Sequence, residues 1–179
     1  EPIWRELEEV SNAWLEAHGG REKAFSLGAF DRAYLRRHPI AIVRQNGIIT
    51  AFANVWVNAG GTRAAVDLMR FHPEKASKGV MDFLLSEMLI WARDEGMQIF
   101  DLGMAPLTGL SETEFASFFA RIGRLVAQYG DSFYSFEGLR TFKDKFDPRW
   151  EPRYISAPGA WTLPIVLAEV GFLSNGPKK

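Results

Sequence analysis

The sequence predicts an α+β fold in which a mixed β-sheet is flanked by helices. Three observations support this prediction. Apolar residues recur at helical spacing near the start of the chain, they alternate with a period of two across residues 40–71, and a long amphipathic pattern then separates this region from one more short apolar run. Three antiparallel strands, a crossover helix and a parallel fourth strand together form such a sheet.

The chain is expected to begin with an amphipathic helix. Its apolar residues lie at spacings of three and four, as on one face of a helix, and Gly19–Gly20 ends the pattern. These apolar residues are Ile3, Trp4, Leu7, Val10, Trp14 and Leu15. We expect residues 1–38 to form a helical lead-in to the sheet.

Three strands are expected next, in the segments IAIVRQ, IITAFANVWV and TRAAVDLMRF. Asn46–Gly47 separates the first two and is typical of a tight hairpin, and Gly60–Gly61 supplies the second turn. A helix should follow, with Ser77 as its N-cap and Gly96 at its end, and MQIFDLG then predicts a short buried strand. This sheet and crossover core spans residues 39–110.

The remaining residues, 111–179, are expected to add helices and one strand to the same single domain, which spans 1–179. The expected elements are helices over 112–128, 135–146 and 164–173 and a strand over 150–157. Pro152 would confine that strand to the sheet edge. The whole order of elements resembles the fold of the GCN5-related N-acetyltransferases.

Composition narrows the chemistry that the chain can perform. The 179 residues include no cysteine, which excludes a disulfide scaffold, a thiolate nucleophile and a zinc knuckle. The three histidines have no metal-ligand spacing and no partnered serine motif, so we expect neither a metal site nor a catalytic triad. A formal net charge of −1 excludes a surface that is basic throughout but not a local basic patch.

No membrane-spanning segment is expected. The longest apolar stretch, residues 159–173, is interrupted by Pro164 and Glu169 and is shorter than the roughly 20 residues that a spanning helix needs. The chain begins at Glu1 without a methionine, and we expect it to be a fragment of a longer protein.

The segment FEGLRTFKDKFDPRWEPRY, residues 136–154, contains the first candidate site. On a helical projection Lys143 falls inside an apolar arc of the predicted helix. Either its stem lies along the aromatic side chains while its ammonium reaches water, or the ammonium is held in a cleft. A buried lysine stays charged only beside an anion or a developing negative charge, and Arg140 could share that task. Glu137, Arg140 and Asp144 also form a column that could be a row of surface ion pairs.

The motif DLMR, residues 67–70, ends the third predicted strand and contains the second candidate site. A carboxylate inside an otherwise apolar strand is costly unless it is paired, so Asp67 needs a compensating group. Strict alternation places Arg70 on the opposite face, and the two side chains can meet only where a bulge or the strand end breaks the period. A pair of Asp67 and Arg70 would either shape the strand end or take part in the function of the protein. Asn54 and Asn58 on the neighbouring strand could line the same cleft.

The loop HPEKASKGVMD leads into the crossover helix, where free backbone N–H groups favour anions. Lys75 and Lys78 stand beside this helix start. Acetyltransferases that use coenzyme A typically carry two glycines here, whereas this sequence has Gly79 alone. Binding of coenzyme A is therefore disfavoured, but binding of another phosphate group stays possible. The segment DLGMAPLTG, at the same end of the sheet, is either a ligand loop or a simple turn.

Several motifs resemble the C-terminal cytosolic synthase domain of the multiple peptide resistance factor family, the aminoacyl-phosphatidylglycerol synthases. They are AFANVW, VDLMRFHPE, GVMDFL, FDLGMAPLTG and YSFEGLRTFKDKFDPRWEPRYISAP, in order between about Phe25 and Pro158. The resemblance implies a transferase that moves an amino acid, most commonly lysine, from the acceptor end of aminoacyl-tRNA to the glycerol hydroxyl of phosphatidylglycerol. It also implies that this chain is the second of two acetyltransferase-like halves, without the first half and the membrane-spanning region. The implied location is the cytoplasmic face of the bacterial cell membrane.

The resemblance suggests roles for the candidate residues and needs no cofactor. Lys143 and Arg140 would stabilise the oxyanion of a transesterification. Asp67 would bind the aminoacyl ammonium or orient Arg70, which would itself bind phosphate. The substrate-binding candidates are Asn54, Lys78, Glu137 and Arg153. Two other functions stay open, namely coenzyme-A-dependent N-acetylation of a small molecule and non-catalytic binding of tRNA or of an anionic membrane.

Overall fold

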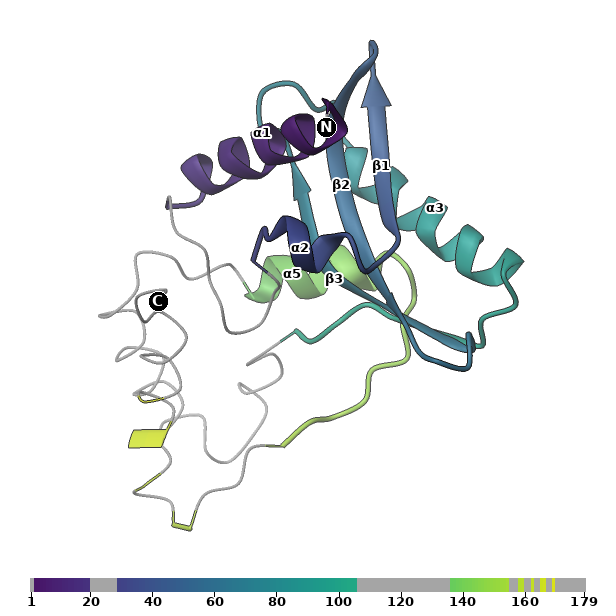
Figure 1. The fold of residues 1–179 in the computed structure, drawn as a ribbon. Coiled ribbons are helices and arrows are strands. Elements are labelled where there is room, and N and C mark those ends of the chain that lie inside the picture. Colours follow the sequence, from purple (N-terminus) through teal and green to yellow (C-terminus); the bar gives the residue numbers. More distant parts are fainter. Residues whose placement is uncertain are drawn as a thin grey trace. The chain divides into compact units, whose positions relative to one another are not determined.

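The computed structural model describes residues 2–19, 29–105 and 136–154, together with 158–159, 162, 165–166 and 169. They belong to two compact units, Glu1–Gly103 and Met104–Lys179 (Figure 1). The first unit contains the sheet, and the second contains the helix that carries Lys143.

A four-stranded sheet forms the first unit, with the strands in the order β1-β2-β3-β4. The strands are β1 (Ile40–Gln45), β2 (Ile48–Val57), β3 (Arg63–Phe71) and β4 (Ile99–Asp101). β1 pairs with β2 and β2 with β3 in antiparallel fashion, and β4 runs parallel to β3 after the crossover helix α3 (Val80–Asp94). The predicted α+β class, a mixed sheet flanked by helices as in the GCN5-related N-acetyltransferases, is therefore confirmed.

The predicted hairpin at Asn46–Gly47 joins β1 to β2. Asn46 has a φ of 52° and Gly47 a φ of 84°. Positive φ at both central residues lets a two-residue turn match the twist of its strands, and asparagine and glycine adopt it at the lowest cost. The local sequence thus sets the register in which Gln45 pairs with Ile48.

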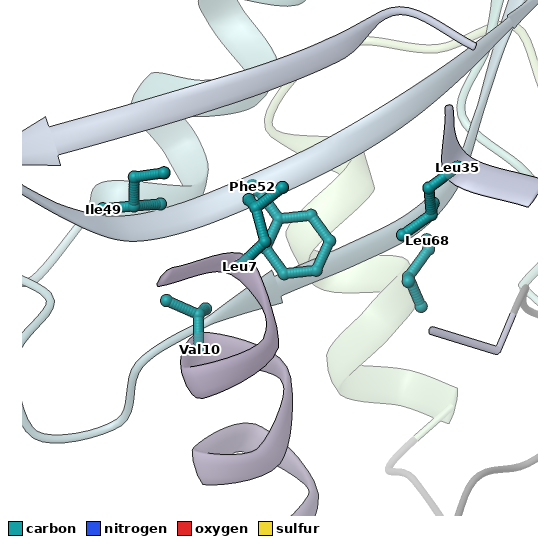
Figure 2. Close-up of a cluster of buried hydrophobic side chains, with 6 residues drawn as sticks. All are labelled: Leu7, Val10, Leu35, Ile49, Phe52 and Leu68. Atoms are coloured by element: carbon teal, nitrogen blue, oxygen red, sulfur yellow. The ribbon is translucent and has the colours of Figure 1, made fainter. Parts of the chain in front are cut away.

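Helices α1 (Pro2–Ala17) and α2 (Arg32–Leu35) pack on one face of the sheet. Their apolar side chains meet those of β2 and β3 in a buried cluster (Figure 2). The cluster consists of Leu7, Val10, Leu35, Ile49, Phe52 and Leu68. Burial of one such side chain stabilises a fold by roughly 1.5–3 kcal/mol, so the cluster anchors both helices to the sheet. The sequence does not predict α2, because four residues are too few to show a helical period.

Helix α3 covers the opposite face of the sheet (Figure 1). Its buried residues are Val80, Leu84, Leu85, Met88 and Ala92, which lie on the predicted apolar face. Alternation along β2 turns the buried Ala51 and Ala53 toward this helix and Phe52 toward α1. The helix ends as predicted, because Gly96 follows the C-cap with a φ of 76°.

The start of α3 differs from the prediction. Its N-cap is Gly79, with a φ of 80° and no side-chain cap bond. Ser77 is engaged by Gln45 instead: its backbone N–H donates to Gln45 Oε1 at 3.1 Å, and its hydroxyl accepts from Gln45 Nε2. The prediction of Ser77 as N-cap is wrong because a partner distant in sequence competes for the serine that the local pattern assigns to the helix.

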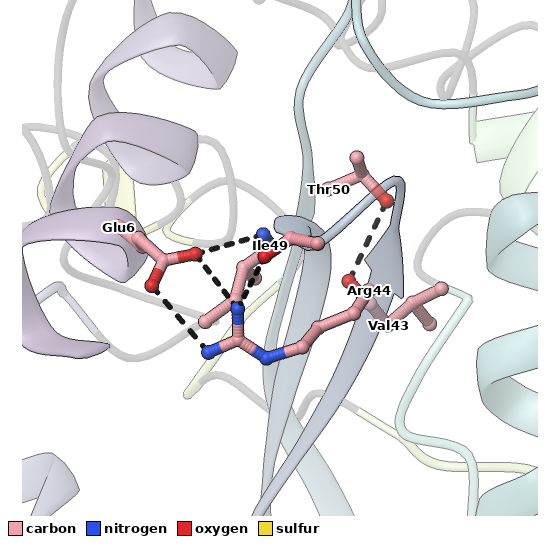
Figure 3. Close-up of polar contacts among 6 residues, drawn as sticks. Glu6, Val43, Arg44, Ile49 and Thr50 are labelled. Carbon is pink, nitrogen blue, oxygen red and sulfur yellow. Dashed lines mark hydrogen bonds and ion pairs between the residues drawn. The ribbon is translucent and has the colours of Figure 1, made fainter. Parts of the chain in front are cut away.

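Polar contacts also tie α1 to the β1–β2 hairpin (Figure 3). Glu6 Oε2 accepts hydrogen bonds of 3.0 Å from the backbone N–H of Ile49 and from Arg44 Nη1. The Ile49 N–H, and after it Arg44, lower the pKa of the Glu6 carboxyl. The strand register shifts between Val43 and Arg44, where the Thr50 hydroxyl donates to the Val43 carbonyl at 3.5 Å.

Helix α5 (Phe136–Asp144) lies in the second unit and confirms the helix predicted over 135–146. The strand predicted over 150–157 is wrong for residues 150–154, which are neither helix nor strand. Trp150 folds back on α5 instead, and its Nε1 donates to Asp144 Oδ1 at 2.7 Å. Pro152 lacks an N–H for a ladder, so the local pattern overstated the strand.

Other predicted elements of the second half are covered only in part. The helix predicted over 112–128 and residues 155–157 lie outside the described residues. Residues 165–166 and 169 of the predicted closing helix are helical. Among the residues that the structure describes, no helix is long and apolar enough to cross a membrane.

Candidate functional site

A bulge in β3 organises the first part of the site. The β2–β3 register shifts between Ala53 and Val55, which leaves one extra residue on β3. The fully buried Asn54 spans this irregularity, since its Oδ1 accepts the Leu68 N–H at 2.8 Å and its Nδ2 lies 3.3 Å from Asp67 Oδ2. The amide therefore satisfies a backbone donor at the bulge and also fixes the carboxylate beside it.

Asp67 lies among aromatic side chains. The Tyr34 hydroxyl, from α2, donates a hydrogen bond of 2.6 Å to Asp67 Oδ2, and Trp56 Nε1 donates to the Tyr34 oxygen. The His38 ring centre lies 4.9 Å from that of Tyr34 and 6.3 Å from that of Trp56. Trp56 is 49% exposed, so this cluster reaches the surface. A carboxylate bordered by aromatic rings is chemically suited to an ammonium group.

The surroundings of the Tyr34 hydroxyl change its pKa. Burial raises the pKa of Tyr34, and the hydrogen bond to the Asp67 carboxylate raises it further. The Trp56 N–H acts in the opposite direction and lowers the pKa. Tyr34 thus stays protonated and keeps its hydrogen for Asp67.

Arg70 lies on the same side of the sheet as Asp67. It is 3% exposed, its Nη1 donates to the Ser11 hydroxyl, and its guanidinium carbon lies 5.0 Å from the centre of the Trp14 ring. Strict alternation would separate Asp67 and Arg70 onto opposite faces, but the bulge turns both toward the face covered by α1 and α2. The bulge, which the sequence pattern required for Asp67 and Arg70 to share a face, is therefore present.

Lys143 is a buried cation of the second unit. It is 6% exposed, and its Nζ donates to the backbone carbonyl of Met104 at 2.8 Å. The ammonium is therefore hydrogen-bonded to the backbone rather than directed to water. A buried ammonium favours anionic groups in its surroundings.

Among the described residues of this unit, the other cations are more exposed than Lys143. Arg140, one turn before Lys143, has its Nε 3.8 Å from Asp144 Oδ2. Arg153 is 69% exposed and pairs with Glu151 at 3.3 Å. Arg149, and after it Arg153, lower the pKa of Glu151. The side chain of Glu137 lies outside the described residues.

Lys78 stands apart from the Asp67 cluster in the fold, at the start of α3. A hollow of about 310 Å³ lies there. It is lined by Val43, Arg44, Gln45, Ser77, Lys78, Gly79, Val80 and Phe83. Asn58 lies at the end of β2 and shapes the following turn, since its Oδ1 accepts the N–H groups of Thr62 and Arg63 at 2.9 Å each. Within the described ranges, no group of three or more histidine, aspartate or glutamate side chains is placed to hold a metal ion.

The sequence matches one known family over most of its length. The family described as phosphatidylglycerol lysyltransferase, C-terminal, covers residues 2–157. The chain belongs to this family. The phosphatidylglycerol lysyltransferase of Bacillus subtilis (strain 168) is 39% identical over 176 residues, which is 97% of this chain and 20% of the relative. That of Staphylococcus aureus (strain MRSA252) is 34% identical over 151 residues, 84% of this chain and 18% of the relative.

Solved structures give the same family likeness. One is the C-terminal domain (DUF2156) of a protein from Agrobacterium fabrum described as a lysylphosphatidylglycerol synthetase, with a TM-score of 0.81 and 40% identity over 99% of this chain. Another is the L-PGS of Bacillus licheniformis, with a TM-score of 0.80 and 34% identity over 97% of this chain. This chain spans 52% of each of those solved chains and about a fifth of the curated relatives.

Sequence reasoning found Asp67, Asn54 and Arg70 in this chain but missed Tyr34 and Trp56. Tyr34 reaches Asp67 from another segment, Trp56 in turn donates to Tyr34, and no local period marks either residue. Asp31 was the available signal, since its side chain accepts the Tyr34 N–H at 2.9 Å as the N-cap of α2. An aspartate shortly before two apolar residues is common, however, so Asp31 alone does not predict a helix.

Proposed function

We propose that this chain is part of an aminoacyltransferase that moves lysine from aminoacyl-tRNA to the glycerol hydroxyl of phosphatidylglycerol. The family match over residues 2–157 is the observation that carries the proposal. The chain would act at the cytoplasmic face of the bacterial cell membrane, as the second half of a synthase region in a longer membrane protein. The partners would be the tRNA acceptor end and the lipid head group.

The reaction is a transesterification. The glycerol oxygen of the lipid forms a bond to the carbonyl carbon of the aminoacyl ester, and an oxyanion develops. The bond from that carbon to the ribose oxygen then breaks, and the glycerol proton ends on the ribose oxygen. No bond to the enzyme is needed, so catalysis would depend on positioning, worth roughly 7–11 kcal/mol, and on cationic stabilisation of the oxyanion.

The proposal gives roles to several described side chains. Lys143, whose ammonium is already desolvated, would stabilise the oxyanion together with Arg140. Asp67, held by Tyr34 and Asn54, would bind the ammonium of the aminoacyl group. Its fixed carboxylate and aromatic border support this role.

The phosphates of both substrates would be bound by cations. The candidates are Arg70, which is 3% exposed and already donates to Ser11, and the exposed Lys78 and Arg153. Asn54 would hold the substrate side of the Asp67 cluster, and Glu137 is a further acid on the same helix as Lys143. These contacts would make tRNA binding weaken as salt concentration rises.

The test is a lipid-transfer assay with the full-length protein that contains this domain. Phosphatidylglycerol vesicles are mixed with radiolabelled lysyl-tRNA, and the lipid product is separated and counted. Lys143→Ala is compared with Lys145→Ala, a matched control in the turn directly after the same helix, whose ammonium is exposed over the Phe142 ring. We expect Lys143→Ala to lower kcat by about 10²–10³-fold and Lys145→Ala to leave it unchanged.

Two outcomes overturn parts of this proposal. Absence of labelled lipid with the wild-type protein refutes the transferase function. Normal lipid production by Lys143→Ala removes Lys143 from the mechanism. Parallel reactions with alanyl-tRNA and arginyl-tRNA test the choice of lysine, which is refuted if either gives more lipid product than lysyl-tRNA.

A further inference from the structure

Two side chains of its own unit hold Arg140. Its guanidinium carbon lies 5.4 Å from the centre of the Trp150 ring, and its Nε lies 3.8 Å from Asp144 Oδ2. Trp150 Nε1 donates to the other oxygen of that carboxylate, Asp144 Oδ1, at 2.7 Å. Each of the three side chains therefore contacts the other two, and we call this arrangement the Arg140 clamp.

The backbone after α5 brings Trp150 back to the helix. The N–H of Phe146 donates to the Lys143 carbonyl at 3.0 Å, and the N–H of Asp147 donates to the Asp144 carbonyl at 3.1 Å. Asp147 then adopts a φ of 47°, a left-handed conformation that aspartate tolerates better than most residues. The chain reverses at this point, and Trp150 returns to the side chain of Asp144.

We infer that Trp150 and Asp144 are positioning residues that hold the Arg140 guanidinium ready to bind an anionic oxygen. The two contacts differ in kind, since the indole covers a face of the guanidinium while the carboxylate approaches its Nε. The side chain of Arg140 nevertheless stays 43% exposed, so a ligand can reach it. The sequence alone presented Arg140 and Asp144 as a surface ion pair, which would not order the guanidinium in this way.

The clamp matters because arginine is a flexible side chain. An unrestrained arginine loses much rotamer freedom when it binds an anion, and that loss weakens binding. A guanidinium that is ordered beforehand avoids this loss and offers a planar pair of donors to phosphate or carboxylate oxygens. The anionic oxygen belongs either to the reacting ester or to the lipid phosphodiester. This assignment of the ligand rests on the proposed function.

The test removes the clamp while it keeps Arg140. Trp150→Leu eliminates both the ring face and the N–H, whereas Trp150→Phe keeps the ring and eliminates the N–H alone. Tyr154→Leu is the matched control, because Tyr154 is an aromatic residue of the same segment that is 88% exposed. The full-length protein is assayed with lysyl-tRNA and phosphatidylglycerol vesicles, and thermal unfolding of each variant is recorded.

We expect Trp150→Leu to lower kcat/KM by roughly 10- to 30-fold, which corresponds to the rotamer freedom of one arginine. Trp150→Phe should recover part of the loss, and Tyr154→Leu should match the wild type. A fall in kcat alone assigns Arg140 to the reacting ester, and a rise in the KM for phosphatidylglycerol assigns it to the lipid phosphate. Both results support the clamp, whereas wild-type values of both constants in Trp150→Leu overturn it.

A spectroscopic measurement separates this inference from the proposed function. The NMR signals of the Arg140 guanidinium, assigned with Arg140→Lys, should be shifted by the Trp150 ring current in the wild type and in Tyr154→Leu. The shift should disappear in Trp150→Leu. If the wild-type protein makes no lipid product, the proposed function fails while this shift still decides the clamp. A signal at the position of an unstructured arginine in the wild type overturns the clamp.

Discussion

The guanidinium carbon of Arg70 lies 5.0 Å from the centre of the Trp14 ring, so a cation on β3 is stacked on helix α1. Arg70 is also almost fully buried and donates to the Ser11 hydroxyl. A desolvated cation gains more from an aromatic face than an exposed one does. The contact thus couples the position of α1 to the strand that carries Asp67.

A double-mutant cycle should reveal this coupling between Arg70 and Trp14. Trp14→Leu, Arg70→Met and the double variant are compared by urea denaturation. We expect a coupling free energy of about 1–2 kcal/mol, because each single variant removes the same stacked contact. Additive changes in the free energy of unfolding would show that the ring and the cation act independently.

Asn54 should be more costly to replace than Asn58, although both are asparagines of the same strand segment. Asn54→Leu leaves the Leu68 N–H of the bulge without its acceptor, which lies 2.8 Å away. We expect the free energy of unfolding to fall by about 1–3 kcal/mol. Asn58 is exposed, and Asn58→Leu should cost less because water replaces its contacts. Equal losses in urea denaturation would contradict this role of Asn54.

Gly79 should be needed for its backbone conformation rather than for lack of space. Its φ is 80°, and a Cβ added there would meet Asp82 Oδ2 at 3.9 Å, an ordinary contact. Gly79→Ala should therefore lower stability by about 1–2 kcal/mol through strain alone. Gly60 is the control because its φ is not positive, and Gly60→Ala should raise stability by about 0.4–1 kcal/mol. Thermal unfolding of both variants tests the contrast, which fails if Gly79→Ala is as stable as the wild type.

The Glu6 carboxylate should make stability depend on acid pH. Its pKa is lowered in the folded protein from the ordinary value of 4.5, chiefly by the Ile49 N–H and then by Arg44. The ionised form therefore stabilises the fold above pH 4.5, and this contribution is lost as the pH falls through the lowered pKa. Glu6→Gln should reduce stability at neutral pH and flatten its decline in acid. Urea denaturation at several pH values below 6 measures the slope, and an unchanged slope would exclude the linkage.

Tyr34 should titrate abnormally because of its environment. Burial raises its pKa, and Asp67 raises it further. Asp67→Asn removes the negative charge and should lower the pKa of Tyr34 toward its ordinary value, although burial keeps it from reaching that value. Tyrosinate absorbance followed against pH, with Tyr34→Phe subtracted, isolates this residue. An identical curve in Asp67→Asn would refute the hydrogen bond between them.

Local sequence signals predicted those parts of the fold that depend on neighbouring residues. The Asn46–Gly47 turn and the glycine after α3 each impose a backbone angle, and alternation marks the three antiparallel strands. Lys143 was identified because a charge inside an apolar helical arc is unusual at any position. These features need no knowledge of the distant chain.

Features that depend on distant partners were not predictable in the same way. Gln45 takes Ser77 from its expected capping role, and Trp150 turns to Asp144 where an edge strand was expected. The sequence showed that Asp67 and Arg70 could share a face only if a bulge were present, but it could not predict the bulge. The register of β3 follows from its pairing with β2, which is distant in sequence. Tyr34 reaches Asp67 from a helix too short to leave a periodic pattern.

The brevity of α2 limits how permanent the Asp67 cluster can be. A helix of four residues does not persist in isolation, so Tyr34 keeps its place only while Leu35 stays docked. Release of this single turn would loosen the carboxylate while the four strands remain paired, as local openings generally precede global unfolding. The amide exchange rate of residues 35–36 therefore reports how long the carboxylate remains oriented between such openings.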